Sequence, residues 1–459
     1  MRGIQINVLL SLLISSYFLF SCGSDELSDG EVSSGTVSEL NNGVIYDWTT
    51  QLLVLERYSS GRPNGSARAL AYIYLAGYET AIPGMPNFLS NSARLEGLEI
   101  ESSNSSEFID YNIALNACMA KSIDHFLKNV PEDLKSQISD LELSLERKFA
   151  NGLSETVIEN SKNWGNYVAD QVIAYSLTDT EAEAQILDPQ PTSYEPPTGD
   201  GFWTFSDEPE RALFPYWSSA RTFVISPEET TSIPPISYSS NSRSDYYEQM
   251  MDVYQKNNKA RVEDGEDLWI AEFWSDDVEG MMISPPARQI SIANQLIDQY
   301  ELNLEESLEL FLKVGFSLND AAVSTWNDKY HYMVMRPNVF IHEYIDPDFQ
   351  TNLFRLVYWP NPSFPGYPSG HSCFASAASG VFIDFFGNDT NFTDRTHEGR
   401  EEFRGSPRTF SSFQKMAKEN AYSRVPLGVH VEMDCEEGLR LGYEIADAIN
   451  ELQLENINN

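Results

Sequence analysis

The chain has 459 residues, of which 41% are hydrophobic and 22% charged, so it is long enough to bury a large core and too apolar to be disordered throughout. Its 30 basic and 69 acidic side chains give a formal net charge of −39. A field of that sign repels phosphate backbones and anionic lipid, which argues against nucleic-acid binding and against membrane adhesion through a basic patch.

The N-terminus predicts a signal peptide over residues 1–21, with an apolar core at 8–20 that is too short to span a bilayer. The sequence LFSC at 19–22 resembles a bacterial lipobox, in which Cys22 becomes the acylated first residue of the mature chain. An ordinary secretory signal with a chance cysteine is the alternative. We expect residues 22–42 to form a flexible acidic tether, and the lipid anchor to hold the protein at the outer membrane or cell surface of a Gram-negative bacterium.

Beyond the tether, apolar residues recur at helical spacing and predict a single, mainly α-helical domain over residues 43–459. The expected helices are 45–60, 66–82, 108–129, 131–150, 153–177, 244–257, 286–302, 304–317, 320–335, 369–386, 410–421 and 436–452. Residues 188–240 are rich in proline and aromatics and predict a long ordered loop, because the aromatic rings need packing partners. Residues 388–409 predict a polar surface insertion. No stretch alternates convincingly as a strand.

Three cysteines follow Cys22, namely Cys118, Cys373 and Cys435. None belongs to a C-x-x-C pair, so neither a zinc site nor a redox motif is supported. One disulfide and three buried free thiols remain alternatives.

The first chemical motif is K-x6-R-P, formed by Lys329, Arg336 and Pro337. On a continuous helix two residues seven apart share a face, so the motif predicts two cations aimed at one place, with Pro337 ending the helix. A solvated basic pair is the alternative, but two aligned cations in so acidic a chain need a partner.

The second motif places Ser369, Gly370 and His371 after Pro368, at the start of an apolar helix. Helix N-termini bind oxyanions through free N–H groups and the helix dipole. A serine cap beside an incidental histidine is the alternative.

The third motif is S-R-x5-H-x3-D, which supplies Arg424, His430 and Asp434. A carboxylate at this spacing can fix the tautomer of the histidine. The motif therefore predicts an oriented imidazole beside a guanidinium.

In this order, the three motifs resemble the superfamily of type-2 phosphatidic-acid phosphatases and vanadium-dependent haloperoxidases. The motif-bearing half covers about residues 265–455. Trp326 and Phe364 stand where vanadium haloperoxidases carry a tryptophan and some carry an aromatic residue. The segment ending in Asp276 resembles the one whose aspartate supports the third-motif arginine, with Asp277 as the alternative.

The resemblance implies a helical-bundle fold and a vanadate cofactor bound to the protein through His430. It also implies that His371 acts as acid–base toward hydrogen peroxide, that Lys329 polarises the bound oxidant, and that a halide is oxidised to a hypohalous-acid equivalent. The implied cradle for the vanadate is Lys329, Arg336, Ser369, Gly370, His371 and Arg424.

Two other functions stay open. A phosphatase of the same superfamily would use His430 as nucleophile through a phosphohistidine, and a surface lipoprotein would bind vanadate or phosphate without turnover. The chain length, Trp326 and the lack of later apolar spans favour the haloperoxidase. Phe364 in place of a histidine disfavours a bromoperoxidase and is compatible with a chloro- or an iodoperoxidase. Iodide, the easiest halide to oxidise, is the expected substrate.

The sequence also leads to expectations about oligomeric state, membrane contact and the other histidines. We expect a monomer that contacts the membrane only through its lipid anchor. The histidines outside the motifs are expected to be structural or at the surface; they are His125, His331, His342 and His397.

Overall fold

Helices dominate the fold, as the apolar spacing predicts, and short polar side chains begin many of them. The side chains of Asp110, Ser154, Ser284 and Asn303 each accept a hydrogen bond from the backbone N–H three residues later. This cap satisfies one of the N–H groups that the first turn of a helix leaves without a partner. The computed structural model describes residues 36–59, 62–101, 108–205, 210–263, 265–276, 278, 280–355 and 360–456.

The elements divide at a long loop over residues 188–244. Before it lie η1 (Val37–Glu39), α1 (Gly43–Glu56), α2 (Arg62–Ala81), η2 (Ile82–Gly84), η3 (Asn91–Ala93), α3 (Tyr111–Phe126), α4 (Glu132–Phe149), α5 (Glu155–Leu177) and α6 (Thr180–Leu187). The loop contains η4 (Trp217–Ser219). After it follow α7 (Asp245–Glu263), α8 (Glu266–Phe273), α9 (Pro285–Gln299), α10 (Leu304–Tyr332), α11 (Pro337–Tyr344), η5 (Asn352–Arg355), α12 (Gly370–Phe386), β1 (Phe392–Asp394), β2 (Arg408–Phe410), α13 (Phe413–Leu427) and α14 (Glu432–Asn450).

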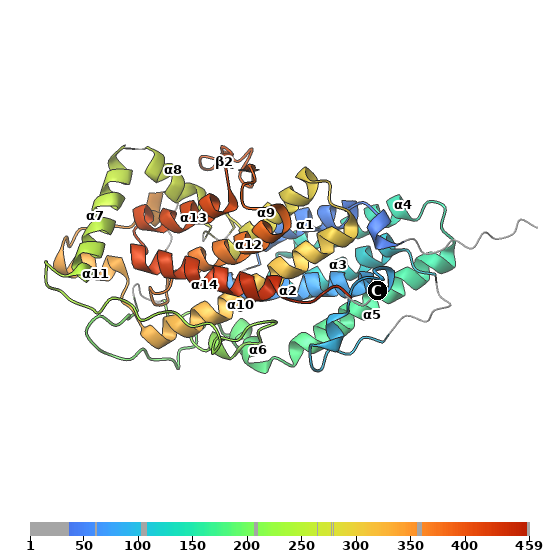
Figure 1. Ribbon diagram of the computed structural model, residues 1–459, viewed down its shortest axis with the longest axis horizontal. Helices are drawn as coiled ribbons and strands as arrows, with labels where there is room; N and C mark the ends of the chain where they lie inside the picture. The colour runs from blue at the N-terminus through green and yellow to red at the C-terminus, as the bar shows by residue number, and fades with distance from the viewer. Residues whose placement is uncertain are drawn as a thin grey trace, which may run out of the picture. The chain divides into compact units, whose positions relative to one another are not determined.

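Helix α10 is the central element of the bundle. It packs against α2, α9, α12 and α14 (Figure 1). Helix α12 also packs along α13 and α14. Helices α2, α3 and α5 pack against one another. None of the described helices combines the length and apolar composition that a membrane crossing needs.

The expected break in α10 near residue 318 is wrong, because the helix runs without interruption from Leu304 to Tyr332. The polar residues that imitate a helix end are buried and bind the long loop. Asp320 accepts the backbone N–H groups of residues 223, 224 and 225, and Asn319 donates to the carbonyl of Arg221.

The long loop is ordered where it is described, as its aromatic content predicts. Trp203 and Trp217 are both 0% exposed. The backbone of Trp203 donates to Met333 at the end of α10, and that of Leu213 donates to Ser363. The loop therefore covers the end of α10 that carries the first motif.

Two boundaries differ from the sequence-based expectation. The helical body begins before residue 43, because Val37 is fully buried and the backbone of Leu304 donates to Leu40. Of the expected tether, residues 22–35 lie outside the described part of the chain, as do Cys22 and the expected signal peptide. Helices α6, α8 and α11 were not expected, because each is too short for a clear apolar period.

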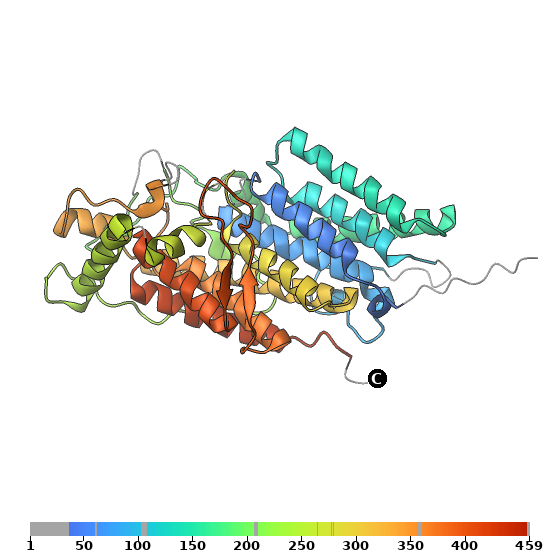
Figure 2. The ribbon, with the colours of Figure 1, turned by 90° about the horizontal axis from the view of Figure 1, so that it is seen from above.

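The insertion at 388–409 is more than a solvated surface segment. It contains the antiparallel pair β1–β2, which pairs Phe392 with Phe410 and which Figure 2 shows from above. The sequence predicted no strands, and this prediction is wrong here. Three-residue strands are too short to show an alternating pattern. Asp394 and His397 are 0% and 2% exposed, so polar residues of the insertion reach the interior.

Candidate active site

The first motif reaches the site through two helices instead of one. Helix α10 ends at Tyr332, and Met333 follows in the left-handed conformation with φ of 52°. Arg336 is the extended residue before α11, and Pro337 begins that helix where the sequence predicts that it ends one. Proline is favoured at a first helical position because the N–H it lacks has no partner there.

Lys329 is fully buried beneath the loop that precedes α12. Its Nζ atom donates to the carbonyls of Pro365 at 3.0 Å and Gly366 at 3.1 Å, and also to that of Pro368. Three acceptors match the three N–H donors of an ammonium group. Burial lowers the pKa of Lys329 well below its usual range, and the charge of Arg336 lowers it further. Lys329 therefore stabilises the loop before α12 through these three backbone carbonyls.

Arg336 connects the same loop to the third motif. Its Nε donates to the carbonyl of Phe364 at 2.9 Å, and its Nη1 donates to that of Val429 at 2.9 Å. The same Nη1 lies 3.1 Å from Nε2 of His430. The guanidinium is 1% exposed, so its charge acts in a medium that screens it weakly.

The second motif forms the start of α12. Ser369 is the cap residue, its hydroxyl accepting from the backbone of Ser372 at 3.4 Å and its own N–H donating to the carbonyl of Asp434 at 2.8 Å. Gly370 lies against Trp326, because a Cβ placed there would come within 3.3 Å of the indole ring. His371 follows, partly exposed.

The third motif holds His430 in one tautomer. Its Nδ1 lies 3.0 Å from Oδ2 of Asp434, an oxygen that also accepts the backbone N–H of Val431 at 3.2 Å. A carboxylate at Nδ1 selects the proton on that nitrogen and leaves the lone pair on Nε2. Burial lowers the pKa of His430 well below its usual value, and Arg336 and Lys329 lower it further, so the neutral imidazole is favoured.

Asp434 is almost fully buried beside these cations. Burial raises its pKa to about 6, while the charge of Lys329 and the N–H of Val431 oppose the rise. The carboxylate belongs to the first turn of α14, where the helix dipole also favours a negative charge. Above pH 6 it is therefore the acceptor that orients His430.

Arg424 lies in the last turn of α13 and is 1% exposed. Its Nη1 donates to the carbonyl of Trp274 at 2.8 Å. The chain then turns at Gly428, where φ of 93° favours glycine, and Val429 and His430 follow at the site.

Asp276 lies two residues beyond Trp274 and pairs with Arg288, whose Nη1 is 3.3 Å from Oδ1, while Nε2 of His397 lies 3.8 Å from the same oxygen. Asp277, the alternative partner expected for Arg424, lies outside the described residues.

A small cavity lies where the motifs meet. The space open to the centre of a water-sized sphere is about 20 Å³, and one water needs roughly 10–15 Å³ by that measure. The cavity therefore suits a small ion better than an organic molecule. Its lining residues are Pro63, Pro285, Trp326, Arg336, Pro362, Phe364, Gly370, His371, Phe374, Arg424, Val429 and His430.

Most of the expected site residues line this cavity, but Asp276 and three others do not. Lys329, Ser369 and Asp434 are not among its described lining residues. Lys329 instead bonds the carbonyl of Gly366, Ser369 bonds the backbone of Ser372, and Asp434 bonds the lining residue His430.

The aromatic wall consists of Trp326 and Phe364, whose ring centroids are 4.9 Å apart. The indole N–H of Trp326 donates to the carbonyl of Leu213 in the long loop at 3.2 Å, which fixes the ring. The Phe364 ring lies 4.8 Å from the guanidinium carbon of Arg336 and 5.2 Å from Nζ of Lys329. The wall thus places π faces against two cations.

Some lining residues carry no sequence signal. Pro63, at the start of α2, and Phe374, one turn into α12, reach the cavity only because α2, α10 and α12 pack together. None of the other histidines lines it. His331 and His342 are exposed, His125 is partly buried, and His397 is buried in a separate network with Arg288.

The three described cysteines form neither a disulfide bond nor a metal site. Cys118, Cys373 and Cys435 are buried free thiols, which agrees with the second of the two alternatives from the sequence. In the described residues there is also no group of three or more His, Cys, Asp or Glu side chains able to hold a metal ion.

Comparison with known proteins supports the fold directly. Residues 309–459 match the family model of the VCPO second helical-bundle domain. The crystal structure of the first bacterial vanadium-dependent iodoperoxidase aligns with a TM-score of 0.79 and 24% identity, covering 91% of this chain and 98% of that one. The chain has the fold of the vanadium-dependent haloperoxidases.

Two further haloperoxidase structures agree with this assignment. The apo and holo forms of a bacterial vanadium-dependent chloroperoxidase align with TM-scores of 0.65 and 0.67, each at 16% identity. They cover 85% and 87% of this chain, and 94% and 93% of theirs. A search of curated protein sequences finds no match. The matched residues 309–459 include α11–α14 and most of α10 and contain all three motifs.

Proposed function

We propose that this protein is a vanadium-dependent haloperoxidase that oxidises a halide, iodide above all, with hydrogen peroxide. The observation that carries the proposal is Nε2 of His430, which lies at the cavity with its partner nitrogen bonded to Asp434. Around it stand two guanidinium groups and a second imidazole, those of Arg336, Arg424 and His371. The Nε2 lone pair faces the guanidinium of Arg336 at 3.1 Å within this ring of cations, and an oxyanion that took over that guanidinium would bring its central atom to the lone pair.

The donor chemistry fits vanadate better than a bare metal cation. One neutral imidazole offers a single metal–nitrogen bond, while Arg336 and Arg424 would repel an uncompensated cation and attract oxyanion oxygens. The N–H of Gly370, at the start of α12, belongs to the helix end that favours negative charge. When bound, vanadate supplies Lewis acidity that activates hydrogen peroxide.

The chain's own residues divide the remaining tasks. His430 would hold the vanadium through Nε2, and Arg336 and Arg424 would neutralise the charge on its oxygens. His371 also lines the cavity and would move protons to and from the peroxide. Lys329 would act indirectly, because its ammonium group binds the carbonyls of the loop before Ser369 and so positions that loop.

The choice of halide rests on the aromatic wall. Trp326 and Phe364 present large polarisable faces to the cavity, and no histidine stands among them besides His371 and His430 in the described lining. Iodide is the most polarisable and most easily oxidised of the halides. The structural similarity to an iodoperoxidase supports the same choice.

The same dyad of His430 and Asp434 would serve a phosphatase nucleophile, so the deciding experiment runs both assays on one preparation. We expect iodide oxidation to require added vanadate and to be inhibited competitively by phosphate, because both oxyanions need the same cations. Iodide oxidation that persists after exhaustive removal of vanadium contradicts the proposal. Turnover of a phosphomonoester without halide oxidation assigns the phosphatase instead.

We also propose that the mature protein is a lipoprotein attached through Cys22. The support is the LFSC sequence at the end of the apolar N-terminal segment. Cys22→Ser removes the acylated thiol, so we expect the protein to leave the membrane fraction or to accumulate unprocessed. Fractionation followed by mass determination of the N-terminal peptide measures this. A Cys22→Ser protein that stays in the membrane fraction after normal processing would overturn the assignment.

A further inference from the structure

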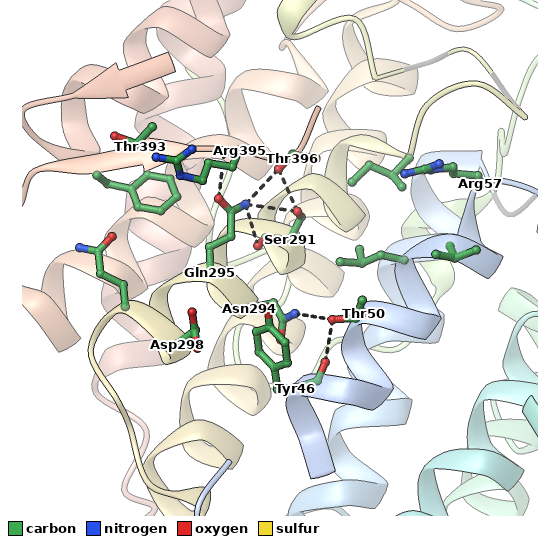
Figure 3. Close-up of a pocket in the computed structure, with 15 residues that line it drawn as sticks. Tyr46, Thr50, Arg57, Ser291, Asn294, Gln295, Asp298, Thr393, Arg395 and Thr396 are labelled. Atoms are coloured by element: carbon green, nitrogen blue, oxygen red, sulfur yellow. Dashed lines mark hydrogen bonds between the residues drawn. The ribbon is translucent and has the colours of Figure 1, made fainter. Parts of the chain in front are cut away.

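A second cavity, separate from the active site, is a groove between α1, α9 and the insertion that carries β1 (Figure 3). By the measure used above its volume is about 530 Å³, which is large enough for an organic ligand. Its lining is Tyr46, Thr50, Leu53, Val54, Arg57, Ile283, Ser291, Asn294, Gln295, Asp298, Gln299, Phe392, Thr393, Arg395 and Thr396. Nothing in the proposed halide chemistry uses these residues.

The centre of the groove is a preorganised set of amides and hydroxyls. The amide nitrogen of Gln295 donates to the carbonyl of Ser291 at 3.1 Å and to Oγ1 of Thr396 at 3.2 Å, and its oxygen accepts the backbone N–H of Arg395 at 2.8 Å. Asn294 donates to Oγ1 of Thr50 at 3.1 Å. Side chains that are already fixed lose little entropy on binding.

Arg57 contributes a half-buried guanidinium to the groove. In the described part of the chain no hydrogen bond or ion pair reaches its guanidinium, and its Nε is buried without a partner. Burial lowers the pKa of Arg57 and the charge of Arg400 lowers it further, while Tyr58 and the carboxylates of Glu402 and Glu56 partly oppose this. In a chain with 69 acidic residues, a half-buried guanidinium without an ion pair indicates a site for an external anion.

The second arginine of the groove differs. Arg395 is already paired with Glu398, its Nη1 lying 2.9 and 3.0 Å from the two carboxylate oxygens. Figure 3 shows Arg395 and Arg57 on opposite sides of Ser291 and Thr396. The carboxylate of Asp298 also lines the groove. Figure 3 shows Asp298 across the groove from Arg57, and one cation and one carboxylate in the same groove suit a ligand of low charge density better than a polyphosphate.

We propose that this groove binds an acidic saccharide, with a sugar carboxylate on Arg57 and sugar hydroxyls on the amides and threonines. Amides, hydroxyls and a carboxylate supply both donors and acceptors, as a polyhydroxylated ligand requires. Tyr46 and Phe392 add apolar ring surface for the C–H faces of the sugar. The insertion at 388–409 thereby has a function: it forms one wall of the saccharide site.

Calorimetric titration of the purified mature protein with a uronic-acid tetrasaccharide tests this, beside the same tetrasaccharide with its carboxylates reduced to alcohols. We expect the acidic form to bind more tightly. Arg57→Met should weaken that binding at least about tenfold, the usual effect of losing a charge-assisted hydrogen bond. Lys415→Met, at an exposed lysine on α13 outside the groove, should leave it unchanged.

Thr393→Asp is a second test in case Arg57→Met weakens binding by misfolding. Thr393 lines the groove and is partly exposed on β1, so a carboxylate can be placed there without burying it. The added carboxylate should weaken the acidic saccharide and spare the neutral one. Iodide oxidation by the Arg57 variant should equal that of the wild type, so the result does not depend on the proposed function. Absence of binding by the wild type, equal binding by Arg57→Met, or binding of acetate as tight as that of the saccharide each overturns the proposal.

Discussion

His430→Ala is expected to release vanadium completely and to reduce iodide oxidation to background. His430 is the cavity imidazole whose tautomer the structure fixes, since its Nδ1 is bonded to Asp434 and its Nε2, the nitrogen proposed to hold vanadium, faces Arg336. The guanidinium groups of Arg336 and Arg424 would still attract an oxyanion, but they cannot form a metal–nitrogen bond. Elemental analysis after gel filtration measures the retained vanadium.

His371→Ala should fail in a different way. The Nε2 atom of His430 and both arginines remain, so vanadium should be retained, while the rate should fall by about 10²–10⁴ through loss of a positioned acid–base group. His331→Ala is the matched control, because His331 is exposed and does not line the cavity. Stoichiometric vanadium in His430→Ala together with loss of vanadium from His371→Ala would reverse the two assignments.

The motif residues of the site were predictable because side-chain type and spacing determine their chemistry. Arg336, His371, Arg424 and His430 line one cavity, although 94 residues separate the first from the last. The order of the motifs identified the fold, and the fold brought them together. The sequence could not show the route, since the chain between Lys329 and Arg336 leaves one helix and starts another.

The position of Lys329 shows a second limit. Its spacing from Arg336 predicted an ammonium pointing at the anion, whereas the structure places Nζ among the carbonyls of residues 365, 366 and 368. A buried ammonium needs several acceptors, and a proline-rich loop leaves carbonyls without helical partners. These acceptors are backbone atoms of a loop, and the path of the loop depends on tertiary packing. No pattern of residue types in the sequence therefore predicts where they lie.

The insertion at 388–409 shows the same limit for polar residues. Its composition predicted a solvated surface, because Asn, Asp, Thr, Arg and Glu are mostly exposed in proteins. Asp394 and His397 are instead buried against Arg288 of α9, about 100 residues earlier in the chain. A buried charge is tolerated only with a partner, and the sequence does not show which distant residue provides it.

Arg288 is the centre of this buried network. It is 0% exposed and lies 3.0 Å from Asp394 and 3.3 Å from Asp276, two carboxylates that are also buried. The guanidinium also contacts His397 and stacks on the rings of Phe273 and Trp274, at 4.6 and 4.8 Å from their centroids. Trp274 in turn provides the carbonyl that holds Arg424, so the network connects the insertion to the wall of the active site.

Arg288→Met is therefore expected to destabilise the fold by about 3–5 kcal/mol, the usual cost of leaving a buried charge without its partner. Asp276 and Asp394 would then stay buried without that guanidinium, and burial favours the neutral form of a carboxyl group over the charged form. A carboxyl group whose pKa is raised by folding loses stability as the pH rises, so the deficit should be larger at pH 8 than at pH 5. Denaturant unfolding at the two pH values measures both effects.

Arg395→Met is the control for that experiment, because it removes an arginine of the same insertion whose side chain is 56% exposed in its pair with Glu398. Surface ion pairs contribute about 0–1 kcal/mol, so this variant should unfold within about 1 kcal/mol of the wild type and without the pH dependence. Equal losses in the two variants would mean that the insertion is held by its apolar contacts, such as Phe392 and Phe410, and that the buried charges do not secure it. A deficit confined to Arg288→Met, greater at high pH, follows only if the two buried carboxylates depend on that one guanidinium.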